Sequence, residues 1–114
     1  MDKTKIVGVT FDGRQEIISN INEMTDILIP IREPDNPYDK NAINVYVKKH
    51  NGKMKSIGYI NRHLAAKLSP EIDEGKDMNI FDFFVTGGTT EKGTIHGVLI
   101  SYTLDPSLSK RKEA

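Results

Sequence analysis

The stretch "AINVYVKKHNGKMKSIGYI", residues 42–60, decides the fold class of this chain. Apolar and polar side chains alternate from Ile43 to Lys48, which predicts a strand with one buried face. Asn51-Gly52 follows, and this dipeptide between two β-rich runs is the strongest short-range signal for a hairpin. Residues 55–60 supply the return strand. The centre of the chain is therefore predicted to be an antiparallel hairpin.

Two further strands are predicted upstream of this hairpin, over residues 4–10 and 26–33. In the second, Ile27, Ile29 and Ile31 share one face because side chains alternate along a strand. Pro30 has no amide hydrogen to donate, so this strand is expected at a sheet edge or bulged. Residues 14–20, after the Asp12-Gly13 turn, are compatible with a short helix or a loop.

Downstream of the hairpin the pattern predicts a helix that begins after Asn61, a good N-cap residue. Leu64 and Leu68 lie on one face of this helix at a spacing of four. Ser69-Pro70 is expected to interrupt the helix, and a second short helical turn is expected to end at Gly75.

Two more strands are predicted near the C-terminus, over residues 78–86 and 95–104, with a loop over residues 87–94. Phe81, Phe83 and Val85 are expected to share a face of the first of them. Helices are too few for a doubly wound parallel sheet. The predicted fold is mainly β with one or two helices (α+β), closed into a small OB-like β-barrel. Residues 1–105 are expected to form one domain, and residues 106–114 a mobile basic tail.

Composition narrows the functional classes. The chain has 114 residues and no cysteine, which excludes disulfides, thiolate metal sites and cysteine nucleophiles. No secretory signal follows the N-terminal "MDKTK", and no apolar run approaches the roughly 20 residues that span a bilayer. We therefore expect a cytoplasmic protein without a membrane partner.

The charges are distributed unevenly although they cancel over the whole chain. Between Lys40 and Pro70 there are seven basic residues and no acidic one. Such asymmetry points to an anionic partner, of which nucleic acid is the common case. The alternative is that solvated lysines cluster there without a function.

Catalytic and metal-binding motifs are weak. His50, His63 and His96 do not pair at helical spacing, so a zinc site is not expected. Glu33, Asp35 and Asp39 could hold magnesium for nuclease chemistry, but Asp35-Asn36-Pro37 is also typical of a turn. The run "TGGTTEKG", residues 86–93, could cradle a phosphate with its amides or simply connect a hairpin. We expect no catalytic residue, no metal and no cofactor.

The loop "REPDNPYDKNA", residues 32–42, is longer than a turn requires. Tyr38 follows a proline within this loop, so the backbone that carries its ring is expected to be stiff. A rigid exposed ring beside positive charge is what single-stranded nucleic acid binds, through stacking worth ~1–3 kcal/mol per base. The alternative is that Tyr38 folds back and covers the core.

The motif "REPDNPYDKNAINV" followed by "IGYINRHLAAKL" resembles the HIRAN domain, a domain found at the N-terminus of certain fork-remodelling ATPases and also in bacterial proteins. The resemblance extends over about residues 5–102 and includes "IVGVTF" and "FVTGG". It implies a modified OB-type barrel that binds single-stranded DNA, particularly at a free 3′ end, in a DNA repair context. A helicase or nuclease is the protein partner that such a module would serve.

The resemblance also implies which residues bind. Phe11 and Tyr38 would hold the terminal base, Asn36 and Asp39 would meet the end nucleotide, and Tyr59 and Arg62 would contact base or phosphate. Asp39 would accept from the 3′-hydroxyl and repel a 3′-phosphate. The chain departs from eukaryotic relatives at Thr10, where they carry arginine, and at Tyr59, where they carry histidine.

Charge adds Arg32 and Lys40 to the predicted site, although Arg32 could instead pair with Asp39 and fix the loop. The leading hypothesis is a non-catalytic module that binds single-stranded DNA or DNA ends. One rival is a protein-interaction module that takes an acidic peptide in the same groove, and another is the metal-dependent nuclease named above.

Overall fold

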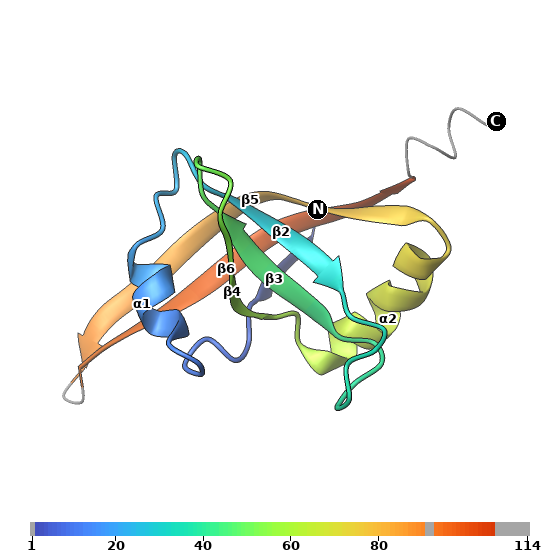
Figure 1. Ribbon diagram of the computed structural model, residues 1–114, viewed down its shortest axis with the longest axis horizontal. Helices are drawn as coiled ribbons and strands as arrows, with labels where there is room; N and C mark the ends of the chain where they lie inside the picture. Colours follow the sequence, from blue (N-terminus) through green and yellow to red (C-terminus); the bar gives the residue numbers. More distant parts are fainter. Residues whose placement is uncertain (1, 91–92, 107–114) are drawn as a thin grey trace.

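The computed structural model describes residues 2–90 and 93–106. Six strands and two helices are present in these ranges (Figure 1). In chain order they are β1 (Asp2–Lys5), α1 (Arg14–Ser19), β2 (Ile27–Arg32), β3 (Ile43–Lys48), β4 (Met54–Tyr59), α2 (Arg62–Asp73), β5 (Lys76–Thr90) and β6 (Gly93–Pro106).

The strands form two antiparallel three-stranded sheets, in the orders β1-β6-β5 and β2-β3-β4. A backbone bridge links the two sheets just after β1. There, the backbones of Val7 and Tyr59, the last residue of β4, exchange two hydrogen bonds of 2.9 Å each. The ribbon shows the two sheets crossing, with α1 and α2 near opposite ends (Figure 1). The predicted OB-like fold, mainly β with one or two helices, is confirmed, and two helices are present.

The central hairpin forms as the sequence predicts. β3 pairs with both β2 and β4, and Ile43, Val45 and Val47 are fully buried. A register shift between Val45 and Tyr46 marks a bulge in the β3–β4 ladder, and such bulges bend a strand strongly. β2 lies at the edge of its sheet, where Pro30 needs no ladder donor.

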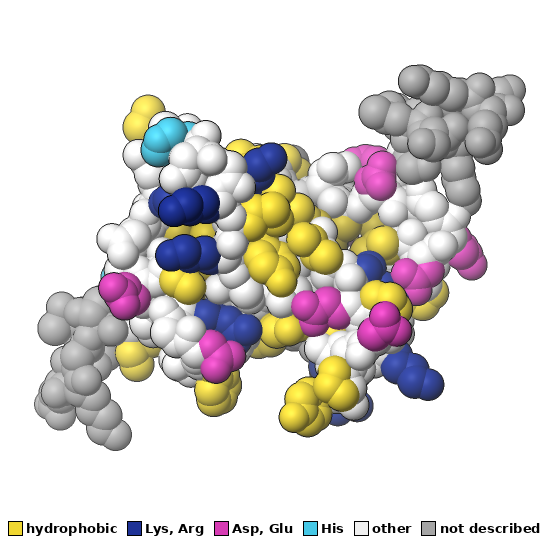
Figure 2. Space-filling model, viewed as in Figure 1, with side chains coloured by type: hydrophobic (Ala, Val, Ile, Leu, Met, Phe, Trp, Pro, Cys, Tyr) yellow, Lys and Arg dark blue, Asp and Glu magenta, His cyan; other side chains and the backbone are white. Residues whose placement is uncertain are grey.

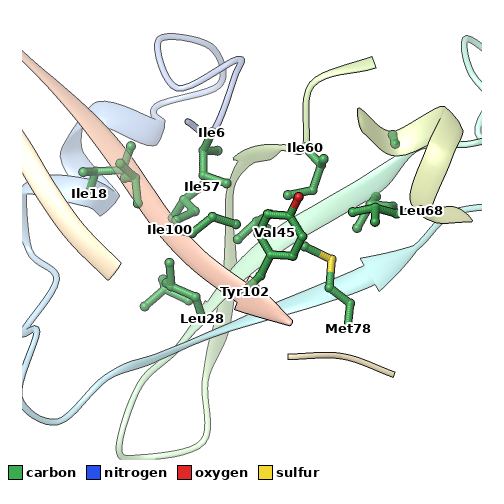
Figure 3. Close-up of a cluster of buried hydrophobic side chains, with 14 residues drawn as sticks. Ile6, Ile18, Leu28, Val45, Ile57, Ile60, Leu68, Met78, Ile100 and Tyr102 are labelled. Carbon is green, nitrogen blue, oxygen red and sulfur yellow. The ribbon is translucent and has the colours of Figure 1, made fainter. Parts of the chain in front are cut away.

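The core lies between the two sheets and beneath both helices (Figure 3). Its side chains come from nearly every element, so no single hairpin or helix could bury them alone. The buried apolar residues include Ile18 of α1, Val45 of β3, Ile57 of β4, Leu68 of α2 and Ile100 of β6.

One predicted strand face is confirmed and another is wrong. On β2 the register is unbroken, so Ile27, Ile29 and Ile31 share one face as predicted, and the core receives Leu28 from the opposite face. On β5 a bulge between Ile80 and Asp82 reverses the alternation, so that Phe81 lies half exposed and Phe83 packs against the core. An extra residue in one strand moves every following side chain to the other face.

The boundaries of three predicted segments also change. β5 and β6 continue through most of residues 87–94, so the predicted loop is a long hairpin, and its phosphate cradle falls partly on residues 91–92, outside the described part. The first strand stops at Lys5, before the turn at Gly8. β6 reaches Pro106, and the predicted mobile tail otherwise lies beyond the described residues.

The helix α2 does not break at Pro70, contrary to the prediction. Pro70 removes a single helical donor, while Leu68 and Ser69 beside it are buried, and the Ser69 hydroxyl donates to Asn41 Oδ1 at 3.0 Å. Burial of this face therefore outweighs the cost of the missing bond. The predicted cap is confirmed, because Asn61 Oδ1 accepts from the Leu64 amide at 2.9 Å. Within the described residues, neither helix has the length and apolar character that crossing a membrane requires.

Candidate nucleic-acid interface

Two loops meet at one edge of the molecule. One follows β1 and covers residues 8–13; the other joins β2 to β3 and covers residues 33–42 (Figure 1). Between them and the start of α2 lies an open hollow of about 840 Å³, which we call the aromatic groove. Its lining residues are Val7, Phe11, Asp12, Arg14, Asn36, Tyr38, Asp39, Ala42, Tyr59, Ile60 and Arg62. In the space-filling view, hydrophobic side chains project on both sides of a notch at this edge (Figure 2).

Tight turns in the first loop hold Phe11 away from the core. Gly8 and Gly13 adopt positive φ, as does Asp12 at 56°. The Phe11 amide donates to the Gly8 carbonyl and the Arg14 amide donates to the Phe11 carbonyl. The ring of Phe11 is left 65% exposed on the groove wall.

Tyr38 faces solvent on the opposite loop. Its side chain is 91% exposed, so the alternative in which its ring covers the core is wrong. Asn36 fixes the backbone here, because its Oδ1 accepts from the Tyr38 amide at 2.8 Å and from the Asp39 amide at 3.1 Å. An Asn side chain that mimics a backbone turn in this way stiffens the loop. The amide oxygen of Asn36 is thus used within the loop.

Asp39 retains one unused carboxylate oxygen. Its Oδ1 accepts from the Asn41 amide at 2.9 Å, and its Oδ2 has no hydrogen-bond partner among residues 2–90 and 93–106. A half-buried carboxylate with one free oxygen at a groove wall is an acceptor for a hydroxyl or an amine.

Beneath the groove, Glu33 ties the loop to the sheet. Its carboxylate accepts from Asn36 Nδ2 at 3.0 Å, from Asn44 Nδ2 at 2.9 Å and from the Tyr59 hydroxyl at 2.9 Å. Burial alone would raise the pKa of Glu33, but these hydrogen bonds outweigh it and lower the pKa below its ordinary value. Glu33 is therefore an ionised anchor of the groove floor.

Tyr59 presents its ring to the groove. Burial, followed by the hydrogen bond to Glu33, raises the pKa of its phenol. The hydroxyl therefore stays protonated and donates to the Glu33 carboxylate beneath the groove. The Arg14 guanidinium lies 5.5 Å from the centre of the ring. A cation at this distance is attracted to the aromatic face and steadies it.

Sequence reasoning missed Arg14, which is 9% exposed on the groove wall. Its Nη1 donates to the Gly8 carbonyl at 2.9 Å, while its buried Nε finds no acceptor in the described residues. The only signal in the sequence was a basic residue directly after the Asp12-Gly13 turn. Arg62, which was predicted, also lines the groove; it is exposed and makes no ion pair or hydrogen bond in the described part of the chain.

Two predicted site residues do not line the groove. Lys40 is exposed and lines a separate, shallower hollow within the β2–β3 loop. Arg32 fastens that loop: it binds Asp73 of α2 through two bonds of 2.9 Å and donates to the carbonyls of Lys40 and Ala42. The hydrogen bond to Asp73 raises the pKa of Arg32. The loop-fixing alternative is thus the observed one, but the partner is Asp73, not Asp39.

The predicted carboxylate trio does not assemble as a metal site. Glu33 directs its oxygens to three donors beneath the groove, and Asp35 is exposed and does not line the groove. Within the described residues, no group of three or more His, Cys, Asp or Glu side chains is placed to hold a metal ion.

Comparison with known proteins agrees with this fold. The chain is similar to the crystal structure of a protein from Lactobacillus plantarum, with 24% identity and a TM-score of 0.62 over 92% of this chain and 93% of that one. It is also similar to the crystal structure of the HIRAN domain of human HLTF, with 24% identity and a TM-score of 0.53 over 98% of this chain and 80% of that one.

An NMR structure of the HLTF HIRAN domain in its DNA-bound conformation gives 22% identity and a TM-score of 0.50, again over 98% of this chain and 80% of that one. No curated protein matches the sequence. The HIRAN domain family itself matches residues 3–91, most of the chain. This protein therefore belongs to the HIRAN domain family.

Proposed function

We propose that this protein is a non-catalytic DNA-binding module that takes the end of a single strand in the aromatic groove. The observation that carries the proposal is the placement of two exposed rings, Phe11 and Tyr38, on opposite loops of one groove. Exposed rings without a core role stabilise nucleic acid by stacking on bases, which have two flat faces. The DNA-bound conformation of a similar domain supports the same choice of ligand.

The polar residues of the groove suit a nucleotide. Arg62 and the buried Arg14 line the groove, and in this proposal they supply positive charge or hydrogen-bond donors to a phosphate or a base edge. The free Oδ2 of Asp39 is an acceptor for a terminal 3′-hydroxyl, and its negative charge would repel a 3′-phosphate. An acidic peptide is a poorer ligand, since its charged side chains offer no aromatic base to stack on the two rings.

The proposal is tested by fluorescence anisotropy on a panel of DNA ligands at two salt concentrations. The panel compares a single strand, a blunt duplex, a duplex with a recessed 3′ end, and a single strand with a 3′-phosphate. We expect the single strand with a 3′-hydroxyl to bind best and the blunt duplex worst. Absence of binding to every single strand at low salt would overturn the proposal.

End recognition is tested separately with Asp39→Asn. This variant should bind the 3′-phosphate and the 3′-hydroxyl with nearly equal affinity, because the repulsive charge is gone. Asp35→Asn is the matched control, since Asp35 lies in the same loop but outside the groove and should leave the discrimination unchanged. Equal binding of the two ends by the unmodified protein would show that the module binds single strands without reading their ends.

A further inference from the structure

The aromatic groove has no net charge of its own. Its basic residues, Arg14 and Arg62, are matched by Asp12 and Asp39. A DNA strand, however, carries one negative charge per phosphate, and neutralising phosphates supplies much of the affinity of nucleic-acid-binding proteins. Beyond the contacts proposed for Arg14 and Arg62, further cations along the strand would therefore come from another surface.

A second hollow of about 470 Å³ lies between α1 and the β3–β4 hairpin. Three lysines line it, and we call it the lysine groove: Lys49, Lys53 and Lys55, together with Gly13, Asn20 and Asn51. Glu16 is the one carboxylate in its lining. Dark blue lysine and arginine side chains gather over β4 and beside α1 on this face of the molecule (Figure 2).

The three lysines are not equivalent. Lys49 is held by the buried carboxylate of Asp26 and by the Asn20 carbonyl, so it forms a fixed part of the wall. Lys53 and Lys55 are exposed, and their ammonium groups have no ion-pair or hydrogen-bond partner within residues 2–90 and 93–106. These two cations are free to meet an incoming anion.

The two grooves are neighbours along the same elements. The turn before α1 contributes Asp12 to the aromatic groove and Gly13 to the lysine groove. Along the β3–β4 ladder, Lys55 pairs with Val47 and Tyr59 pairs with Asn44, three residues away on β3, a distance of about 10 Å at the rise of a strand. Arg14 spans the interval, since its Nη2 reaches Ser56 Oγ at 3.4 Å. A single strand that leaves the aromatic groove over Gly13 would enter the lysine groove within a few nucleotides.

From these contacts we infer that the lysine groove binds the phosphodiester backbone of the strand whose end nucleotide occupies the aromatic groove. The inference rests on the proposed function. Stacking and end recognition belong to the aromatic groove, and salt-dependent attraction belongs to Lys53 and Lys55. A strand too short to extend beyond the aromatic groove would gain little affinity from these lysines.

The test compares Lys53→Gln/Lys55→Gln with the unmodified protein on two single strands. One has about three nucleotides, below the site size of OB-type folds, and the other has about twelve, within it. Lys3→Gln/Lys67→Gln is the matched control, because it removes the same charge from exposed positions that line neither groove. Affinity is measured at several salt concentrations, and thermal unfolding checks that each variant is folded.

The unmodified protein should bind the longer strand more tightly and with a steeper salt dependence. The groove variant should lose this length advantage, and its slope of log affinity against log salt should fall by about 1.4, from ~0.7 for each of two phosphate contacts. Binding of the short strand should hardly change, and the control should resemble the unmodified protein.

Three results would overturn the inference while leaving the proposed function intact: equal affinity of the unmodified protein for both lengths, an unchanged salt slope in the groove variant, or an equal loss in the control. Absence of binding to either strand by the unmodified protein would instead reject the proposed function, and the inference with it.

Discussion

At the scale of single residues, the exposure of Tyr38 is the most informative feature of this protein. A tyrosine that is 91% exposed contributes almost nothing to the core, and yet the backbone on either side of it is fixed by Asn36. Rigid presentation of an aromatic ring lowers the entropic cost of binding a flat ligand. A functional explanation of the ring is therefore stronger than a structural one.

Tyr38→Ala should weaken binding of single-stranded DNA by about 5- to 150-fold, which corresponds to the ~1–3 kcal/mol of one stacked base. The thermal midpoint should stay the same, because no core contact is lost. Fluorescence anisotropy and thermal unfolding measure the two quantities. Phe84→Ala removes another exposed ring, on β5 outside the groove, and should leave binding unchanged. Unchanged binding by Tyr38→Ala would exclude stacking on this ring.

Glu33 gives the protein an acid-sensitive anchor. Its pKa is lowered in the folded state, so it stabilises the fold at neutral pH, and this stabilisation is lost as the pH falls through the lowered value. Glu33→Gln should cost about 1–3 kcal/mol at pH 7, because a donor beneath the groove loses its acceptor. The difference from the unmodified protein should shrink as the solution is acidified.

Urea unfolding at a series of pH values measures this effect. Asp35→Asn is the control: it removes an exposed carboxylate of the same loop that makes no hydrogen bond in the described part of the chain, and it should change stability little at any pH. A Glu33→Gln variant whose loss of stability is the same at pH 7 and in acid would rule out an ionised anchor.

At the scale of elements, the β2–β3 loop depends on the helix α2. Arg32 at the end of β2 joins Asp73 of α2 to two carbonyls of the loop. The planar guanidinium can serve all these acceptors at once, whereas a lysine ammonium is a point charge with a different geometry. The loop that carries Tyr38 is thereby clamped at its base.

Arg32→Lys should accelerate amide hydrogen exchange in residues 38–42 and weaken DNA binding, yet keep the salt dependence of binding, since the Arg32 guanidinium is engaged by Asp73 and two loop carbonyls. Asp73→Asn should have a similar effect from the other side of the ion pair. Lys76→Gln, which breaks the exposed pair with Glu71 on the same part of the fold, should leave the loop unchanged. A reduced salt slope in Arg32→Lys would instead identify Arg32 as a phosphate contact.

At the scale of the whole molecule, the aromatic groove depends on the junction of the two sheets. Val7 and Tyr59 pair there, and Gly58 lies beside them with φ of 149°. A Cβ at Gly58 would lie 2.4 Å from the Val7 carbonyl oxygen and 2.6 Å from Ile6 Cγ2. Only glycine allows the backbones to approach this closely.

Gly58→Ala should therefore destabilise the protein by more than Gly52→Ala, by about 1–3 kcal/mol of overpacking. Gly52 also has positive φ, at 89°, but a Cβ there would meet nothing within 4 Å. Gly52→Ala therefore measures the cost of a positive φ in a residue with a side chain, without a steric clash. Urea unfolding midpoints of the two variants provide the comparison. Equal stability of the two variants would mean that the backbones at the junction of the two sheets move apart around the new Cβ without loss of stability.

Several features followed from the sequence because local chemistry determines them. The central hairpin depends on strict alternation and on Asn51-Gly52, and the start of α2 depends on the Asn61 cap. The loop motif around Tyr38 indicated the family and six of the residues that line the aromatic groove: Phe11, Asn36, Tyr38, Asp39, Tyr59 and Arg62.

Other features were decided only by the tertiary structure, because they depend on contacts between segments far apart in the chain. The bulge in β5 and the outward face of β2 arise from pairing and packing that apolar periodicity does not encode. Arg14 joins the groove because α1 packs against β4, and Arg32 leaves it because Asp73 lies within reach. Local sequence thus determined the central strands, the turns and the exposed ring of Tyr38. Long-range packing decided which charged side chains, such as Arg14, line the groove beside that ring.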